Sequence, residues 1–91
     1  MTWTLRYAAS AVRSLRKLDP QVQRRLKAAL EELAENPERG KPLQMTLQGL
    51  RSWRTGDFRI VYRVLTDRIE VLVLALGHRR DVYARVRRLL E

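Results

Sequence analysis

The sequence contains no cysteine, a single histidine, four glycines and three prolines. The absence of cysteine excludes disulfide bonds, thiolate metal ligands and thiol catalysis together. The lone histidine has no second histidine or cysteine with which to bind zinc, so we expect no metal and no cofactor. Hydrophobic residues still make up 45% of the chain, which favours a folded protein over a disordered one.

Long hydrophobic runs are also missing from the chain. The longest one, residues 71–76, is far too short to span a bilayer. Residues 1–6 do not have the layout of a signal peptide. We therefore expect a cytoplasmic protein without a membrane among its partners. A length of 91 residues predicts one domain, residues 1–91, with a modest core.

Acidic residues are scarce relative to basic ones. Lysine and arginine number 19 against 10 aspartates and glutamates, which gives a formal net charge of +9. This charge on a small surface favours a nucleic acid, an acidic protein or an anionic membrane as partner, with solubility as the simplest alternative. Residues 51–63 and 78–88 hold four and five arginines, and each segment has one acid. Because guanidinium groups grip phosphate in pairs, we place nucleic acid first.

The spacing of apolar residues predicts the elements of the fold. Residues 2–7 alternate as a strand with one buried face does, and apolar residues recur at helical spacing on both sides of Asp19. Asp19-Pro20 is typical of a helix start, and Asn36-Pro37 of a helix end. After a loop, the expected elements are strands at residues 50–54, 58–64 and 69–76 and a helix at residues 79–90.

This order, β-α-α-β-β-β-α, predicts an α+β fold in which a small antiparallel sheet packs on two N-terminal helices. Gly56-Asp57 is placed to form the first hairpin turn of the sheet. We expect the two helices to cover one face of the sheet and to leave the other face free. In the strand at residues 58–64, Ile60 would point toward the helices and Arg59 toward the free face.

Four residues on the strands or in the last helix are candidates for chemistry. Arg59 and Arg54 could grip a phosphate and stabilise charge on its oxygens, although a solvated strand face explains them equally well. His78 follows Gly77 at a strand end and could act as a general acid or base, whereas a lone histidine is more often a surface or capping residue. Tyr83 could orient a phosphate or stack on a base, or be a half-buried core residue.

Three segments, taken in order, carry a family resemblance. They are residues 7–22, residues 47–62 and the stretch Gly77-His-Arg-Arg-Asp-Val-Tyr83. These segments resemble the first helix and turn, the middle strands and the C-terminal signature of the RelE family, within the RelE/ParE toxin superfamily of type II toxin–antitoxin systems. The resemblance covers nearly the whole chain and implies the RelE-like microbial RNase-type fold.

The resemblance implies a metal-independent endoribonuclease that cuts messenger RNA, commonly in the ribosomal A site, and so inhibits translation. The ribose 2′-hydroxyl attacks the neighbouring phosphate and leaves a cyclic phosphate and a free 5′-hydroxyl. By this resemblance, Arg59 matches the arginine that stabilises the transition state, and Arg79 an arginine that serves the phosphate or the leaving group. Tyr83 matches the tyrosine that orients the substrate. Further residues expected to bind RNA are Lys41, Arg51, Arg54, Arg80 and Arg87.

The chain departs from the family on the strand before the hairpin. Some members carry two lysines there, and this chain has Leu50 and Ser52 at the corresponding positions. Arginine is too basic to replace lysine as a proton acceptor. We therefore expect His78 to serve as general acid or base, and Lys41 to supply part of the missing positive charge.

The resemblance also implies an acidic antitoxin as partner, with DNA contacted only through the antitoxin. A net charge of +9 makes an acidic partner physically sensible. Two alternatives stay open. One is a ParE-like toxin that poisons DNA gyrase; such chains often lack the strand arginine that Arg59 supplies, whereas the missing lysines favour this alternative. The other is a non-catalytic or degenerate module that binds RNA or the antitoxin without cleavage.

Overall fold

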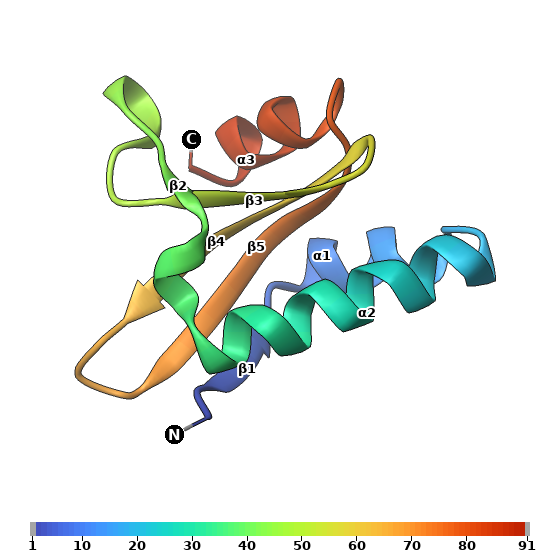
Figure 1. Cartoon of the computed structure of the whole chain (residues 1–91). Helices are drawn as coiled ribbons and strands as arrows, with labels where there is room; N and C mark the ends of the chain where they lie inside the picture. The colour runs from blue at the N-terminus through green and yellow to red at the C-terminus, as the bar shows by residue number, and fades with distance from the viewer. Residues whose placement is uncertain (1, 91) are drawn as a thin grey trace.

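The computed structural model describes residues 2–90 and confirms the α+β class, with three α-helices and a five-stranded sheet (Figure 1). The elements are β1 (Thr4–Tyr7), α1 (Ala9–Arg16), α2 (Pro20–Glu35), β2 (Lys41–Pro42), β3 (Arg51–Thr55), β4 (Phe58–Leu65), β5 (Glu70–His78) and α3 (Val82–Leu90). The strand order in the sheet is β1-β5-β4-β3-β2. Strands β3, β4 and β5 form the expected antiparallel meander.

The two outer strands differ from the sequence-based expectation. Strand β1 runs parallel to β5, with Thr4 opposite Glu70 and Tyr7 opposite Val73. Parallel neighbours need a long connection, and the two helices and the meander between β1 and β5 provide it. Strand β2 lies within the segment expected to be a loop and pairs antiparallel with β3. Alternation of apolar residues indicates a strand, but it does not indicate the direction of the neighbouring strand.

Helices α1 and α2 cover one face of the sheet, below it in Figure 1, and together they bury the first core. The side chain of Asp19 accepts a hydrogen bond from Gln21 N–H at 3.0 Å, and Pro20 is the first helical residue, so α2 begins where the sequence predicts. The first core consists of Ala11, Leu26, Ala29, Leu30, Leu33, Ile60, Tyr62, Val71, Val73 and Leu76. Within residues 2–90, no helix is both long enough and apolar enough to cross a membrane.

The other face of the sheet is not left free as expected, because α3 packs on it (Figure 1). This second core consists of Leu47, Leu50, Val61, Ala75, Val82 and Val86. Val61 and Ala75 are apolar residues of β4 and β5 on the face away from α1 and α2, so this face also needs cover. Val82 and Val86 of α3 are fully buried in this core, whereas Leu89 and Leu90 at the end of the helix are exposed. Arg54 stays exposed at the hairpin end of this face.

Tyr62 ties the segment after α2 to the first core. Its hydroxyl donates to the carbonyl oxygen of Pro37 and accepts from Gly40 N–H at 3.0 Å. Burial raises the pKa of the Tyr62 phenol, and the Gly40 hydrogen bond and the charge of Arg51 act in the opposite direction. A Cβ atom at Gly40 would collide with the Tyr62 hydroxyl. The close approach of backbone and phenol therefore requires glycine at this position.

Candidate functional site

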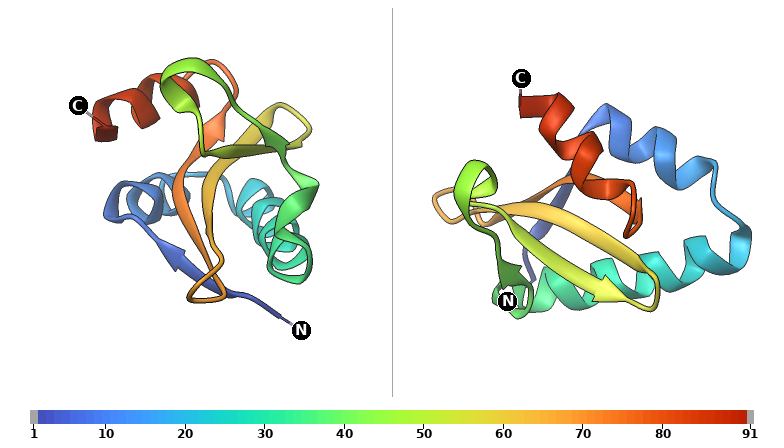
Figure 2. Two further views of the ribbon diagram at one scale, coloured as in Figure 1. Left: turned by 90° about the vertical axis from the view of Figure 1, so that its left-hand side faces the viewer. Right: turned by 90° about the horizontal axis from the view of Figure 1, so that it is seen from above.

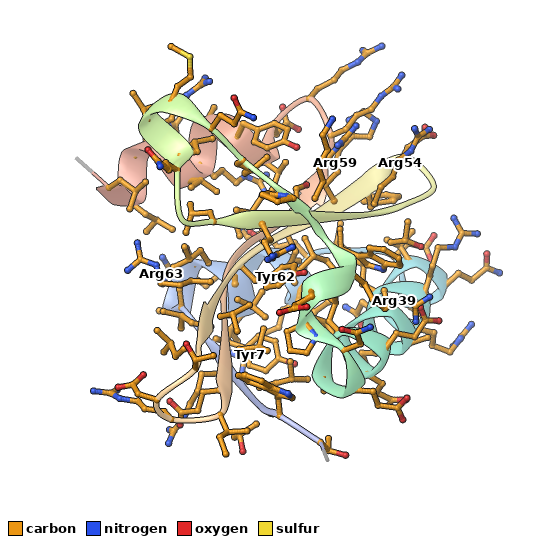
Figure 3. All side chains as sticks on the ribbon, turned by 60° about the vertical axis from the view of Figure 1, so that its left-hand side comes forward. Tyr7, Arg39, Arg54, Arg59, Tyr62 and Arg63 are labelled. Atoms are coloured by element: carbon orange, nitrogen blue, oxygen red, sulfur yellow. The ribbon has the colours of Figure 1, made fainter. Side chains whose placement is uncertain are left out.

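The hairpin end of the sheet brings together three of the predicted arginines. Arg54 and Arg59 lie opposite each other in the β3–β4 register. Arg79 N–H donates to the carbonyl oxygen of Asp57 at 2.9 Å, which holds the turn after β5 against the β3–β4 turn. Figure 3 shows Arg54 and Arg59 together at this end, with Arg63 farther away along β4. Residues that are far apart in sequence thus reach one end of the sheet.

A two-residue turn between β3 and β4 sets this geometry. Gly56 has a φ of 61°, in the left-handed region that glycine adopts without strain. Thr55 and Phe58 pair on either side of the turn, so Arg54 and Arg59 form the next pair. Side chains directly opposite each other in an antiparallel ladder point to the same face. The two guanidinium groups therefore share the face of the sheet on which α3 packs.

Arg59 is held against α3 by Tyr83. Its Nη1 atom donates to the Tyr83 hydroxyl oxygen at 3.2 Å, and its Cζ atom lies 5.9 Å from the centre of the Tyr83 ring. The Oγ atom of Ser52 lies 3.1 Å from the same hydroxyl, and either oxygen can donate. These side chains form a hydrogen-bonded chain that links β3, α3 and β4. Since a guanidinium group has five N–H donors, Arg59 can bind an anion while Tyr83 holds it in place.

Lys41 and Arg87 extend the positive charge of this face. Lys41 lies opposite Ser52 in the β2–β3 register, so its side chain belongs on the same face as Ser52. Arg87 follows Tyr83 by four residues on α3, a spacing that puts both on one side of the helix. Both basic residues are exposed. The register thus places Lys41 next to Ser52, at one of the positions where the family resemblance leads us to expect a lysine.

The other arginines at this end are less firmly placed than Arg59. The Nε atom of Arg54 donates to the carbonyl oxygen of Gly56 at 3.1 Å, which turns its guanidinium group toward the hairpin turn. Arg79 and Arg80 are exposed in the turn between β5 and α3. The backbone therefore gathers these arginines around the candidate phosphate site, and the contact with Tyr83 orders Arg59 within it.

Arg51 is not part of this group. It alternates with Ser52 and Arg54 along β3 and therefore points to the opposite face of the sheet. Its Nη1 atom donates to the carbonyl oxygens of Glu38 and Gly40, at 3.1 and 2.7 Å. These bonds stabilise the segment after α2, so the structure does not bring Arg51 to the expected phosphate-binding face.

His78 also lies apart from Arg59 and Tyr83. It pairs with Phe58 in the β4–β5 ladder, and the two rings meet edge to face with their centres 5.9 Å apart. Its Nδ1 atom accepts a hydrogen bond from Arg80 N–H at 3.2 Å. Successive residues of a strand point to opposite faces, so His78 faces α1 whereas Arg59 faces α3. The geometry therefore gives no support to the expectation that His78 exchanges protons beside Arg59.

For two residues, Ser52 and Arg85, the sequence did not indicate the contacts that define their positions. Ser52 stands out there only as a missing lysine, yet it is buried, 6% exposed, and bonded to Tyr83. Arg85 packs against α1, with its Nη1 atom donating to Ser14 Oγ at 3.2 Å. The glycine at position 77 is the one sign of this contact in the sequence. Gly77 has a φ of 151°, and a Cβ atom there would lie 2.9 Å from Arg85 Nη1, so the position favours glycine.

The α3 side of the hairpin end offers cations and hydroxyl groups for binding. Within residues 2–90, no three His, Cys, Asp or Glu side chains gather where they could hold a metal ion. Guanidinium groups donate paired hydrogen bonds to phosphate and stabilise negative charge that develops on its oxygens. The arrangement around Arg59 can therefore bind a phosphodiester and stabilise a more negative transition state.

Comparison with known sequences identifies related proteins. Residues 5–83 match the family described as ParE toxin of type II toxin–antitoxin system, parDE. The chain is 38% identical to Toxin RelG of Mycobacterium tuberculosis over 90 residues, which cover 93% of this chain and 100% of that protein. It is 34% identical to Toxin RelE of the same organism over 77 residues, which cover 82% of this chain and 79% of that protein.

Solved structures show the same fold. A chain of the Mycobacterium tuberculosis RelBE2 toxin–antitoxin complex superposes with a TM-score of 0.82 and 34% identity, over 89% of this chain and 95% of that one. A chain of the intact Escherichia coli RelBE complex superposes with a TM-score of 0.71 and 29% identity, over 84% and 95% of the two chains. The chain therefore belongs to the RelE/ParE superfamily and is a RelE-like toxin of a type II toxin–antitoxin system.

Proposed function

We propose that this toxin is an endoribonuclease that cleaves messenger RNA in the cytoplasm, at the ribosome, and so inhibits translation. The observation that carries the proposal is the 3.2 Å hydrogen bond between Arg59 and the Tyr83 hydroxyl, at the sheet end where Arg54 and Arg79 also lie. This bond fixes one cation where an RNA phosphate can approach and leaves other cations exposed around it. The relatives named RelG and RelE are toxins of the same superfamily.

The proposed reaction uses the RNA as its own nucleophile. The ribose 2′-hydroxyl gives up its proton to solvent as its oxygen attacks the adjacent phosphorus. The bond to the 5′-oxygen breaks and this oxygen takes up a proton, so the products are a cyclic phosphate and a free 5′-hydroxyl. Negative charge rises on the phosphate oxygens in the transition state, and Arg59 donates N–H groups to it. Arg79 binds the phosphate or the leaving oxygen, and Tyr83 orients both Arg59 and the RNA. Alignment of the 2′-oxygen with the breaking bond supplies the rest of the rate enhancement.

Positive charge on this face comes from a different strand than in some relatives. Lys41 on β2 stands next to Ser52, so it can supply the charge that a lysine on β3 supplies elsewhere. Ser52 itself holds the Tyr83 hydroxyl. The protein then accelerates the reaction mainly by aligning the RNA and by stabilising negative charge. Lys41, which pairs with Ser52 in the β2–β3 register, adds to the positive charge.

The test is to add purified protein to translating ribosomes and to map the new 5′ ends. We expect Arg59→Ala to reduce cleavage about 10²–10³-fold, as when one preorganised donor to a developing oxyanion is removed. Arg63→Ala is the matched control, because Arg63 is exposed on the same strand and lies away from the hairpin end. Equal cleavage by Arg59→Ala and the wild type would contradict the proposal. The same assay on free messenger RNA measures the dependence on the ribosome.

We further propose that an acidic antitoxin neutralises the toxin and provides the only contact with DNA. Solved relatives are toxin–antitoxin complexes. Opposite charge speeds encounter and sets register, and the formal charge of +9 suits an acidic partner. A short acidic reading frame beside the gene should encode a protein that binds the toxin and stops cleavage. A neighbouring product that binds without reducing toxicity would contradict this assignment.

A second candidate function is favoured by the family match, which carries the ParE name. A ParE-like toxin would poison DNA gyrase and would not need the arginines at the hairpin end. The double variant Arg59→Ala, Arg79→Ala separates the two functions, because an endoribonuclease would lose toxicity and a gyrase poison would keep it. Inhibition of purified gyrase by the wild type would support the second candidate. RNA binding without cleavage would instead indicate a non-catalytic module.

A further inference from the structure

A groove runs between α1 and α3 along the free edge of β5. Strand β1 pairs with residues 70–73 of β5, so among the described residues the C-terminal half of β5 has no strand on that side. Helices α1 and α3 both pack against β5, and Figure 2 shows them close to each other in the view from above. The space between them forms two adjoining hollows of about 340 and 250 Å³. Both hollows are lined by residues from α1 and α3.

The lining of this α1–α3 groove is strongly basic. Helix α1 and its C-cap residue contribute Arg13 and Lys17, and α3 contributes Arg85 and Arg88. Asp81 is the acid among the lining residues. None of the four cations forms an ion pair within residues 2–90. Four cations facing one carboxylate make the groove a site for an anion.

Arg85 is held in place at the centre of the groove. Its Nη1 atom lies 3.2 Å from Ser14 Oγ and 3.4 Å from the carbonyl oxygen of Leu76. Gly77 lets the guanidinium group pass, since a Cβ atom at that position would lie 2.9 Å from Nη1. Arginine carries five N–H donors, so donors beyond Nη1 stay available for a ligand.

A hydroxyl group in the same place lacks a hydrogen-bond partner. The Oγ atom of Ser10 is buried, and among the described residues it has no partner. Ser10 lines both hollows, next to Arg13 and Arg85. Buried hydroxyl groups are nearly always hydrogen-bonded, so Ser10 Oγ has unused hydrogen-bonding capacity within the groove.

We propose that the α1–α3 groove binds the phosphate backbone of RNA, as a second site apart from the cleavage face. The inference rests on the proposed function, because RNA is the ligand in both. Arginine forks and serine hydroxyl groups suit the tetrahedral, oxygen-rich phosphate group. Two hollows in a row suit a ligand that repeats its charge at intervals, as a polynucleotide does.

The two sites meet at the turn between β5 and α3. His78 lines the groove, and the next residue, Arg79, is bonded to Asp57 beside the Arg54–Arg59 pair. One RNA can therefore cross this turn and contact both sides of the sheet. Phosphates in the groove add affinity without sequence preference, while the phosphate at Arg59 is placed for cleavage.

His78 makes the inference directly testable, because it is the only histidine of the chain, it lines the groove, and its ring lies on the face of the sheet opposite to Arg59. Three probes are titrated while these signals are followed by NMR: inorganic phosphate, a 2′-O-methyl oligoribonucleotide that lacks the attacking hydroxyl, and a glutamate-rich peptide of equal charge. We expect the oligonucleotide to shift the His78 signals at lower concentration than the other two. Shifts caused by the peptide and not by the oligonucleotide would overturn the inference in favour of an acidic protein partner.

Two double variants are matched in charge: Arg13→Ala, Arg85→Ala removes two cations that line the groove, and Arg16→Ala, Arg24→Ala removes two cations that do not line it. We expect the first pair to weaken oligonucleotide binding about tenfold or more and to lower the slope of log K against log salt by about 0.7 for each lost phosphate contact. The control pair should keep the wild-type slope. Equal effects of the two pairs would overturn the inference.

A second variant of the groove keeps the test valid if Arg13→Ala, Arg85→Ala fails to fold. Lys17→Ala, Arg88→Ala removes two exposed groove cations and should reproduce the loss of slope. The cleavage assay then separates the two proposals. If Arg59→Ala cuts like the wild type while the oligonucleotide still shifts His78, the proposed reaction fails and the groove stands. If Arg59→Ala abolishes cleavage but the oligonucleotide leaves the His78 signals unchanged, the groove proposal fails alone.

Discussion

The two faces of the sheet carry cores of unequal strength. Helix α2 alone contributes four residues to the core on the face that it shares with α1, and Leu26, Leu30 and Leu33 are almost fully buried there. On the other face, α3 contributes two buried residues, Val82 and Val86. Hydrophobic stabilisation grows with the apolar area removed from water. The first core therefore supplies most of the stability of the fold, and the second core keeps α3 packed on the sheet.

This difference matters for function because Tyr83 and Arg85 are residues of α3. Their side chains connect α3 to Ser52 and Arg59 on one side and to Ser14 on the other. A change in the second core should therefore disturb the proposed RNA sites before it unfolds the protein. A change in the first core should unfold both faces together.

The strongest test of this comparison is Leu30→Ala in the first core. Leu30 is 1% exposed, and a Leu→Ala change at such a site costs about 2–5 kcal/mol of the free energy of unfolding. Urea denaturation measures the loss. Leu90→Ala on α3 is the control, since Leu90 is 48% exposed and should change stability by no more than about 0.5 kcal/mol. Similar losses for the two variants would show that the first core does not dominate.

Tyr62→Phe tests the polar part of the first core. It removes the acceptor of Gly40 N–H and the donor to Pro37, and buried groups left without partners cost about 1–3 kcal/mol. Urea denaturation at neutral pH measures the change. Unaltered stability would show that the phenol does not anchor this segment.

The same variant carries a pH signature. Burial raises the folded-state pKa of Tyr62 above the value of 10.0 that applies to the free side chain. The unfolded chain then loses its proton first, so the stability contributed by the neutral phenol is present below pH 10 and falls as the pH rises above it. Tyr62→Phe should flatten this decline in unfolding experiments across that range. Tyr7, whose pKa is also raised by burial, accounts for a remaining decline.

Val86→Ala sharpens the comparison on the second core. Val86 is fully buried, and the loss of two carbon atoms at about 0.8 kcal/mol per buried CH₂ group predicts a cost of about 1–2 kcal/mol. Hydrogen exchange should show faster exchange throughout α3, with little change in β4 and β5. Equal loss of protection in α3 and in the central strands would mean that the two cores unfold as one unit.

Ser52→Ala is expected to give the smallest effect. The hydroxyl of Tyr83 loses one neighbour but keeps the hydrogen bond from Arg59, so the net cost is about 0.5–1.5 kcal/mol. If that loss appears in the transition state, messenger-RNA cleavage falls about two- to tenfold. Ser52→Thr retains the hydroxyl group and should cleave nearly as the wild type does. A defect in Ser52→Thr as large as in Ser52→Ala would argue against the hydrogen-bonded chain.

Several features were predictable because they depend on residues close together in sequence. Asp19-Pro20 and Asn36-Pro37 mark the ends of α2, and the structure has this helix at Pro20–Glu35. Gly56 marks the β3–β4 turn, whose two residues place Arg54 opposite Arg59. Caps, turns and side-chain alternation act over a few residues, so they are legible without tertiary structure.

The candidate site was only partly predictable. Alternation along β4 indicated the face on which Arg59 lies, and Tyr83 was expected near it. On β5, a bulge between Val73 and Ala75 interrupts the alternation, and only the β4–β5 register shows that His78 pairs with Phe58 on the face opposite to Arg59. Ser52 looked like a missing lysine because its partner Tyr83 lies 31 positions away along the chain.

The amino-acid sequence by itself determined the local elements, the excess of arginine and the presence of cations near one hairpin. Tertiary structure decided that β1 runs parallel to β5, that α3 covers the second face and that His78 and Arg85 line a groove with α1. The physical reason is distance along the chain. Local conformation follows from neighbouring residues, whereas strand pairing, register and the meeting of two helices depend on contacts between residues that only the folded chain brings together.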